Sequence, residues 1–144
     1  ESLILFFTDK AVCIKFSEDG VNQSAEFSYN GKNLLGYDVK NSQIVMALGD
    51  YEGAENADIA ITDLSLNENF RTTADHNIKT VVISSQRIYA LGDEMVSQYT
   101  TEGVYVAQHA VKNNIKNIVD YNGCVAVYSD GMEKIEKVKA EKSS

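Results

Sequence analysis

The chain has 144 residues, 44% of them hydrophobic, a composition that excludes an intrinsically disordered protein and suits one domain with its own core. Acidic residues outnumber basic ones by 21 to 13, so the formal charge of −8 argues against nucleic acid as a partner and favours a basic or polar ligand or an unknown protein. No run reaches the roughly 18 apolar residues of a membrane-spanning helix.

Residues 1–32 predict three β-strands. Apolar and polar residues alternate in "SLILFFTDK", "AVCIKFS" and "VNQSAEFS", and the turn-forming "SEDG" separates the last two. The sequence starts without Met inside an apolar run, so we expect a fragment whose upstream part is missing. Cys13 lies in one of these strands and Cys124 in a later one, and both are expected to be small core residues rather than a disulfide pair.

Residues 33–76 predict four strands, which we letter A to D. Strands A and B form in "NLLGYDVKNSQIVMALGDY", and strands C and D form in "ADIAITDLSLN" and "ENFRTTADHN". The B–C connection "GDYEGAENAD" is longer than its counterparts and carries Asp50, Glu52, Glu55 and Asp58. Because their spacing does not match an EF-hand, a solvated acidic loop is the favoured interpretation and a cation site the alternative.

Residues 77–113 repeat this pattern, and residues 114–138 repeat most of it. "NIKTVVISSQRIYALGDEM", from Asn77, overlays "NIKNIVDYNGCVAVYSDGM", from Asn114, without a gap. "EMVSQYTTEG" and "VYVAQHAVKNN" supply strands C and D of the third unit, and "MEKIEKV" is the last strand. Residues 139–144 are a charged tail that we expect to be frayed.

Antiparallel four-stranded units repeated in this way indicate an all-β fold, a β-propeller half of about four blades. The blades carry strands BCD, ABCD, ABCD and ABC and span residues 1–32, 33–76, 77–113 and 114–138 of one repeat domain, 1–138. Since a lone blade cannot bury both faces, the end blades need cover. Missing N-terminal blades would supply it, or a second copy of the chain in a homodimer that completes the ring.

An Asn precedes strand A and an Asp follows strand B in each full unit. The pairs are Asn33 with Asp50, Asn77 with Asp93, and Asn114 with Asp130. We expect each pair to lie side by side at the open end of its hairpin, with the Asp accepting hydrogen bonds from backbone donors freed there. A ring of cation ligands is the alternative, although calcium needs many oxygens clustered on one loop.

The B–C turns and the D–A connectors are expected on one face, because successive strands alternate in direction. Loops on one face of a rigid scaffold commonly carry binding. The candidate binding residues there are Asp50, Tyr51, Glu52, Glu55, Asp58, His76, Asp93, Glu94 and Asp130. Of the eight tyrosines only Tyr51 is expected to be free for recognition, while the others pack between blades.

The two histidines, His76 and His109, lie near D–A connectors. Asp75 precedes His76, a pairing that could suggest a metal ligand or a general base. Adjacent residues on an extended chain point to opposite faces, so we favour a polar connector. No catalytic, metal-binding or cofactor-binding residue is predicted, and no cofactor.

The segments "GKNLLGYDVKNSQIVMALGD", "DIAITDLSLNENF" and "IKTVVISSQRIYALGDEMVSQYTTEG" resemble a family of unknown function from Gram-positive bacteria. The resemblance implies a short cytoplasmic stretch, one membrane-spanning helix and an extracytoplasmic propeller related to quinoprotein and WD-repeat proteins. It places this chain in the C-terminal half of such a propeller, with the membrane anchor in an absent N-terminal segment. It supplies no catalytic residues.

These features lead us to expect a non-enzymatic extracytoplasmic scaffold or binding module. A quinoprotein-like oxidoreductase fragment is one alternative; the resemblance implies that such enzymes stack their quinone on Trp, and this chain has none. An envelope assembly factor that binds proteins is a second alternative.

Overall fold

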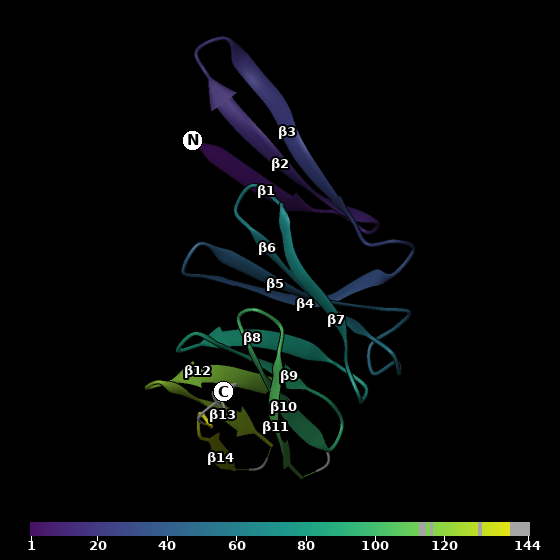
Figure 1. The fold of residues 1–144 in the computed structure, drawn as a ribbon, viewed down its shortest axis with the longest axis vertical. Coiled ribbons are helices and arrows are strands. Elements are labelled where there is room, and N and C mark those ends of the chain that lie inside the picture. The colour runs from purple at the N-terminus through teal and green to yellow at the C-terminus, as the bar shows by residue number, and fades with distance from the viewer. Residues whose placement is uncertain (113–114, 116, 130, 139–144) are drawn as a thin grey trace, which may run out of the picture.

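A computed structural model describes residues 1–112, 115, 117–129 and 131–138. Within these residues the chain forms fourteen strands and no helix, arranged in four antiparallel sheets. Figure 1 shows the sheets stacked along the long axis of the molecule, from β1–β3 at one end to β12–β14 at the other. The prediction of an all-β partial propeller is confirmed.

Each sheet follows the chain order, and the strand distribution is BCD, ABCD, ABCD and ABC as predicted. The first sheet holds β1 (Ser2–Phe6), β2 (Lys10–Ser17) and β3 (Gly20–Ser28). The second holds β4 (Asn33–Lys40), β5 (Gln43–Gly49), β6 (Asp58–Asp63) and β7 (Glu68–Thr73). The third holds β8 (Thr80–Ser84), β9 (Arg87–Leu91), β10 (Met95–Thr100) and β11 (Tyr105–Ala110). The fourth holds β12 (Asn117–Tyr121), β13 (Cys124–Tyr128) and β14 (Met132–Ile135).

The core lies between successive sheets rather than inside any one of them. Strand β5 is buried on both sides, because Ile44 and Met46 face the first sheet while Val45 and Ala47 face the third. The A strands stack directly, β4 on β8 and β8 on β12. Stacking therefore buries apolar surface that no sheet could bury alone.

Some tyrosines are buried in the sheet stack and others are exposed. Burial raises the pKa of Tyr29, Tyr89 and Tyr99 to about 12, because the charged phenolate is disfavoured inside the stack. The expectation that only Tyr51 is free was wrong, since Tyr37 is 51% exposed and Tyr105 is 46% exposed. The two cysteines are free and buried, as predicted.

Single extra residues interrupt the pairing at regular places. In β4 the extra residue is Leu35, which accounts for the second repeat being one residue longer than the third. Each D strand also carries one unpaired residue opposite its C strand, namely Ser24 in β3, Asn69 in β7 and Val106 in β11. Such β-bulges twist a strand and end regular pairing along its outer edge.

The last strand is shorter than predicted: β14 ends at Ile135, whereas "MEKIEKV" extends to Val138. Beyond it the backbone binds a side chain of the third sheet instead of a strand. The buried Gln98 amide donates to the Glu136 carbonyl at 2.7 Å and accepts from the Val138 amide at 3.0 Å. The buried Arg87 also donates to the Val138 carbonyl. The predicted tail, 139–144, lies outside the described residues, and the domain boundaries stay a prediction.

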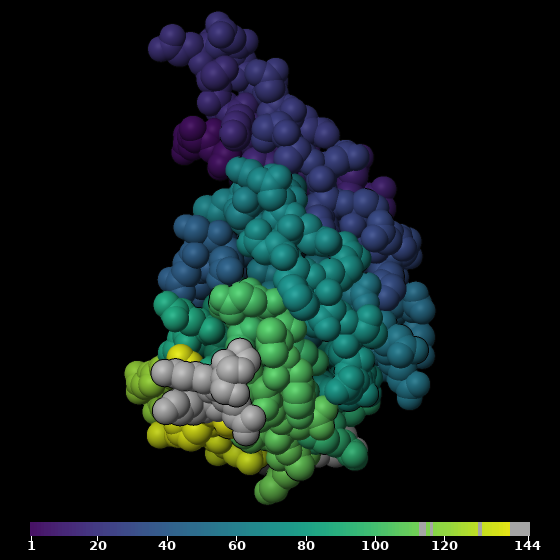
Figure 2. Space-filling model, viewed as in Figure 1, coloured from purple at the N-terminus to yellow at the C-terminus, as the bar shows by residue number. Residues whose placement is uncertain are grey.

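In the part of the chain that the structure describes, no helix has the length and apolarity of a membrane span. Figure 2 shows that the first sheet forms the narrow end of the molecule, while the other three pack into a broader body.

Candidate binding face

The B–C turns and the D–A connectors meet on one side of the sheet stack, which we call the acidic face. Its described residues are 7–9, 29–33, 50–57, 74–79, 92–94, 111–112, 115, 129 and 131. The Gly53 amide donates to the Ile78 carbonyl at 3.1 Å, joining the long B–C loop to the connector before β8. In the third sheet the Val111 amide donates to the Glu94 carbonyl at 3.0 Å. Backbone contacts thus hold turns and connectors together.

The long loop after β5 presents charged and aromatic side chains from an anchored backbone. Ala54 and Ala57 are buried beneath it, and Gly53 has a φ of 82° that allows the tight bend. Above these anchors Tyr51 is 67% exposed, the most exposed large hydrophobic side chain of the described residues. The loop therefore holds its outward side chains at fixed positions.

Two hollows open on the acidic face, one between the second and third sheets and the other beside the B–C turn of the third sheet. One has a volume of about 420 Å³ and is lined by Glu55, Asn56, Asp75, His76 and Asn77. The second has a volume of about 470 Å³ and is lined by His76, Asn77, Asp93, Glu94 and Met95. The residues common to both are His76 and Asn77, which form the ridge between them.

Both ring nitrogens of His76 are engaged within the chain. Nδ1 donates to the Asn77 carbonyl at 2.6 Å, and Nε2 lies 2.5 Å from the hydroxyl of the buried Ser97. Neither nitrogen is available to a metal or to a reacting group in this arrangement. No hydrogen bond of the described residues joins Asp75 to His76. The other histidine, His109, accepts from the Gln98 amide at 2.8 Å.

The Asn and Asp pairs do lie side by side, but the Asn side chain makes the bonds. Asn33 Nδ2 donates to the carbonyl of Asp50 at 2.8 Å. Asn77 Oδ1 accepts from the amide of Asp93 at 3.1 Å, and its Nδ2 donates to the Asp93 carboxylate. The prediction that each Asp accepts from backbone donors was therefore wrong for the two described pairs. A carboxamide both donates and accepts hydrogen bonds, so Asn77 can bind the amide and the carboxylate of Asp93 at once. Asn114 and Asp130 lie outside the described residues.

The candidate carboxylates fall into two groups, according to whether a cation neutralises them. Asp58 pairs with Lys32 at 3.1 Å and with Arg71 at 3.6 Å, so it does not belong to the solvated loop in which we placed it. Lys79 lies 3.2 Å from the carboxylate of Asp93. These pairs stabilise the fold and offer a partner little charge.

On the second and third sheets, five exposed carboxylates of the acidic face have no cationic side chain within 4.0 Å among the described residues. They are Asp50, Glu52, Glu55, Asp75 and Glu94. They border the long loop and the two hollows, so a negative potential is concentrated between the second and third sheets. Sequence reasoning overlooked Asp75 as a member of this group.

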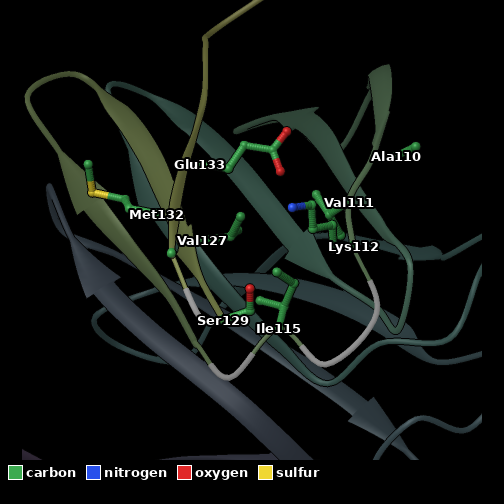
Figure 3. Close-up of a pocket in the computed structure, with 9 residues that line it drawn as sticks. Ala110, Val111, Lys112, Ile115, Val127, Ser129, Met132 and Glu133 are labelled. Atoms are coloured by element: carbon green, nitrogen blue, oxygen red, sulfur yellow. The ribbon is translucent and has the colours of Figure 1, made fainter.

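Two more hollows continue along the same face. One, of about 480 Å³, is lined by Phe6, Phe7, Thr8, Asn33 and Leu34, between the first and second sheets. The other, of about 460 Å³, lies between the third and fourth sheets, where Figure 3 shows Val111 and Lys112 opposite Met132 and Glu133. Neither hollow could be predicted from the sequence, because each depends on how neighbouring sheets diverge.

Among the described residues no group of three or more His, Cys, Asp and Glu side chains could hold a metal ion.

The chain matches no protein-family model and no curated protein. It is similar to solved β-propeller structures. Hsv2 from Kluyveromyces marxianus has a TM-score of 0.65 and 18% identity, over 94% of this chain and 46% of that one. BamB from Moraxella catarrhalis has a TM-score of 0.62 and 10% identity, over 87% of this chain and 40% of that one. A europium-containing methanol dehydrogenase has a TM-score of 0.52 and 12% identity, over 76% of this chain and 22% of that one.

The chain therefore spans less than half the length of each of these structures. At these identities the likeness is one of fold, a propeller built from stacked four-stranded sheets.

Proposed function

We propose that this partial propeller is a non-enzymatic binding or scaffold module whose acidic face docks a basic segment of a partner protein. One observation carries the proposal: five carboxylates without a cationic partner among the described residues lie on one rigid face, and three of them, Glu55, Asp75 and Glu94, line its two hollows. Charges left unneutralised on a stable scaffold steer and orient a partner of opposite sign.

The shape of the site suits long cationic side chains. Each hollow has carboxylates at its rim, Glu55 and Asp75 at one and Glu94 at the other. A Lys or Arg stem can lie along such a hollow while its charged end meets a carboxylate. The exposed Tyr51 ring offers a face for a cation beside the same loop.

Charge reversal tests this proposal, with a lysine-rich peptide as the probe. The triple variant Glu52→Lys, Glu55→Lys and Glu94→Lys should bind the peptide at least about tenfold more weakly, with a smaller dependence on salt. Fluorescence anisotropy at two salt concentrations measures both quantities.

The matched control is Glu18→Lys, Asp19→Lys and Glu102→Lys. These exposed residues lie in C–D turns on the opposite side of the sheets and change the net charge by the same amount. The control should retain peptide binding. Equal losses in the two triple variants would mean that net charge, and not this face, governs binding.

A quinoprotein-like oxidoreductase fragment is the second candidate, favoured by the fold likeness to the methanol dehydrogenase. Visible absorption of the purified protein with added quinone and calcium separates it from a binding module. The extracytoplasmic, membrane-anchored location is also part of our proposal and draws support from the sequence resemblance alone.

A further inference from the structure

We propose that Gln98 and His109 of the third sheet form an acid-sensitive clamp. The clamp holds residues 136–138, which we call the strap, while the His109 ring is neutral, and it releases them when the ring gains a proton. None of its residues lines any of the four hollows described above, so the clamp does not depend on the function of the acidic face.

The strap is bound by a side chain in the place where a sheet would use a strand. Beyond Ile135 the Glu136 carbonyl accepts from Gln98 Nε2 at 2.7 Å, and the Val138 amide donates to Gln98 Oε1 at 3.0 Å. In an extended chain the carbonyl of one residue and the amide of the second residue after it point to the same side. The fully buried Gln98 carboxamide therefore pairs with the strap as a neighbouring strand would.

The partners of Gln98 fix which way round its carboxamide lies. The Val138 amide can only donate, and so can the Arg87 guanidinium, which donates to Oε1 at 3.2 Å. The Glu136 carbonyl can only accept, and it meets Nε2. Exchanging the two ends of the carboxamide would set donor against donor or acceptor against acceptor in all three contacts.

This orientation sets the proton state of His109. Gln98 Nε2 lies 2.8 Å from His109 Nε2 and, with one hydrogen bound to the Glu136 carbonyl, presents its other hydrogen to the ring. His109 Nε2 must therefore be the accepting nitrogen of a neutral imidazole. A protonated imidazole carries a hydrogen on both nitrogens, so two donors would oppose each other at a buried amide. Protonation thus breaks the contact that completes the clamp.

His109 is the side chain in this region whose charge ordinarily changes at mildly acidic pH. The titratable and charged side chains of the surrounding elements are Arg87 and Tyr89 of β9, Glu133 and Lys134 of β14, Glu136 and Lys137 of the strap, and Glu94 and Lys112 beyond the ends of β10 and β11. Between about pH 7.5 and pH 5.5 such side chains ordinarily keep their charge state, whereas histidine gains its proton. Because the ring accepts a proton more easily once the strap has left, falling pH favours release.

Release of the strap uncovers a buried cation. Arg87 is 6% exposed and donates to the Val138 carbonyl as well as to Gln98. No carboxylate among the described residues lies within 4.0 Å of its guanidinium. The strap therefore controls access to a cationic site between the third and fourth sheets.

Amide hydrogen exchange of the full chain, followed by NMR, tests the clamp. The protection factor of the Val138 amide, which corrects for the intrinsic exchange rate at each pH, should fall at least about fivefold between about pH 7.5 and pH 5.5. The Thr100 amide, which donates to the Val104 carbonyl at 2.8 Å, is the internal reference and should keep its protection.

Three variants identify the group responsible. His109→Gln keeps a side-chain oxygen for Gln98 Nε2 but does not titrate, so the Val138 amide should stay protected at both pH values. His76→Gln removes the other histidine of the chain and should retain the pH dependence of the parent protein. Gln98→Ala should leave the Val138 amide poorly protected at both pH values. Circular dichroism checks that each variant is folded.

Constant protection of the Val138 amide in the parent protein across this pH range would overturn the proposal. An undiminished pH dependence in His109→Gln, or its loss in His76→Gln, would overturn it as well, because another group would then be the trigger. An equal loss of protection at Thr100 would mean that acid opens the third sheet as a whole, which also contradicts a local clamp.

Discussion

Among the individual residues, Asn77 and Gly92 explain the "LGD" at residues 91–93, which follows strand B of the third sheet. The Asn77 side chain bonds to Asp93, and a Cβ at Gly92 would lie 2.4 Å from the Asn77 carbonyl oxygen and 2.6 Å from Nδ1 of His76. Glycine is needed there because the D–A connector passes directly over it. The sequence paired Asn77 with Asp93, 16 residues apart, but it did not show that the Asn77 carboxamide makes both hydrogen bonds or that Gly92 lies beneath the connector.

Replacing Asn77 with Ala should lower the free energy of unfolding by about 1–2 kcal/mol, because a part-buried Asp93 amide loses its acceptor. Urea unfolding followed by circular dichroism measures the change. Asn22→Ala, in an exposed position of β3 without a described side-chain hydrogen bond, is the control and should be close to neutral. Equal stability of the Asn77→Ala and Asn22→Ala variants would show that the contact contributes little.

Between elements, a polar network joins the A strands of three successive sheets. Lys40 of β4 donates to the Ile83 carbonyl at 2.7 Å and to the Asp120 carboxylate at 3.1 Å. Ser84 of β8 donates to the same carboxylate at 2.7 Å, and the Ile83 amide donates to Asp38 at 2.8 Å. The network ties β4, β8 and β12 together where apolar contact alone would leave their relative position less defined.

This network should make the stacking sensitive to acid. The hydrogen bond from Ser84, followed by that from Lys40, holds the pKa of Asp120 below its ordinary value of 3.8. A carboxyl group with a lowered pKa in the folded state contributes stability above its unfolded pKa, and that contribution is lost as the pH falls through the folded value. The free energy of unfolding should therefore fall less between pH 6 and pH 3 in the Asp120→Asn variant than in the parent protein.

Urea unfolding at the two pH values measures this difference. Asp19→Asn, an exposed turn residue, is the control and should keep the acid dependence of the parent protein. A parallel pH profile for Asp120→Asn and the parent would contradict a role for Asp120 in the stack.

The strands could be predicted from the sequence, because the alternation of apolar and polar residues and the turn residues are local signals. Asn122–Gly123 and Asn41–Ser42 both have positive φ angles, as two-residue hairpin turns require. The network was not predictable, since Lys40 and Asp120 meet only after three sheets have stacked. The acidic loop was recognised from composition, but the ion pairs of Asp58 depend on Lys32 and Arg71, which arrive from outside that loop.

At the scale of the whole molecule, the two end sheets differ from the middle ones in having a face without a neighbour among the described residues. On the first sheet this face carries Leu3, Leu5, Val12, Ile14 and Phe16, the side chains opposite to those that pack on the second sheet. Leu3 is 46% exposed and Phe16 43% exposed, and Val21, paired with Phe16, is 62% exposed. A stacked-sheet fold leaves such a face uncovered at each end unless the stack closes into a ring.

We expect a second copy to cover this face, across a two-fold axis that completes the ring. Light scattering at micromolar concentration should then show a dimer of about twice 15.9 kDa. Val21→Glu should shift the equilibrium toward monomer, because a charge would be buried at the contact. Val104→Glu, in a comparably exposed valine of the third sheet, should leave it unchanged. A monomer at all concentrations would exclude the ring-closing pair. A dimer unaffected by Val21→Glu would place the contact elsewhere.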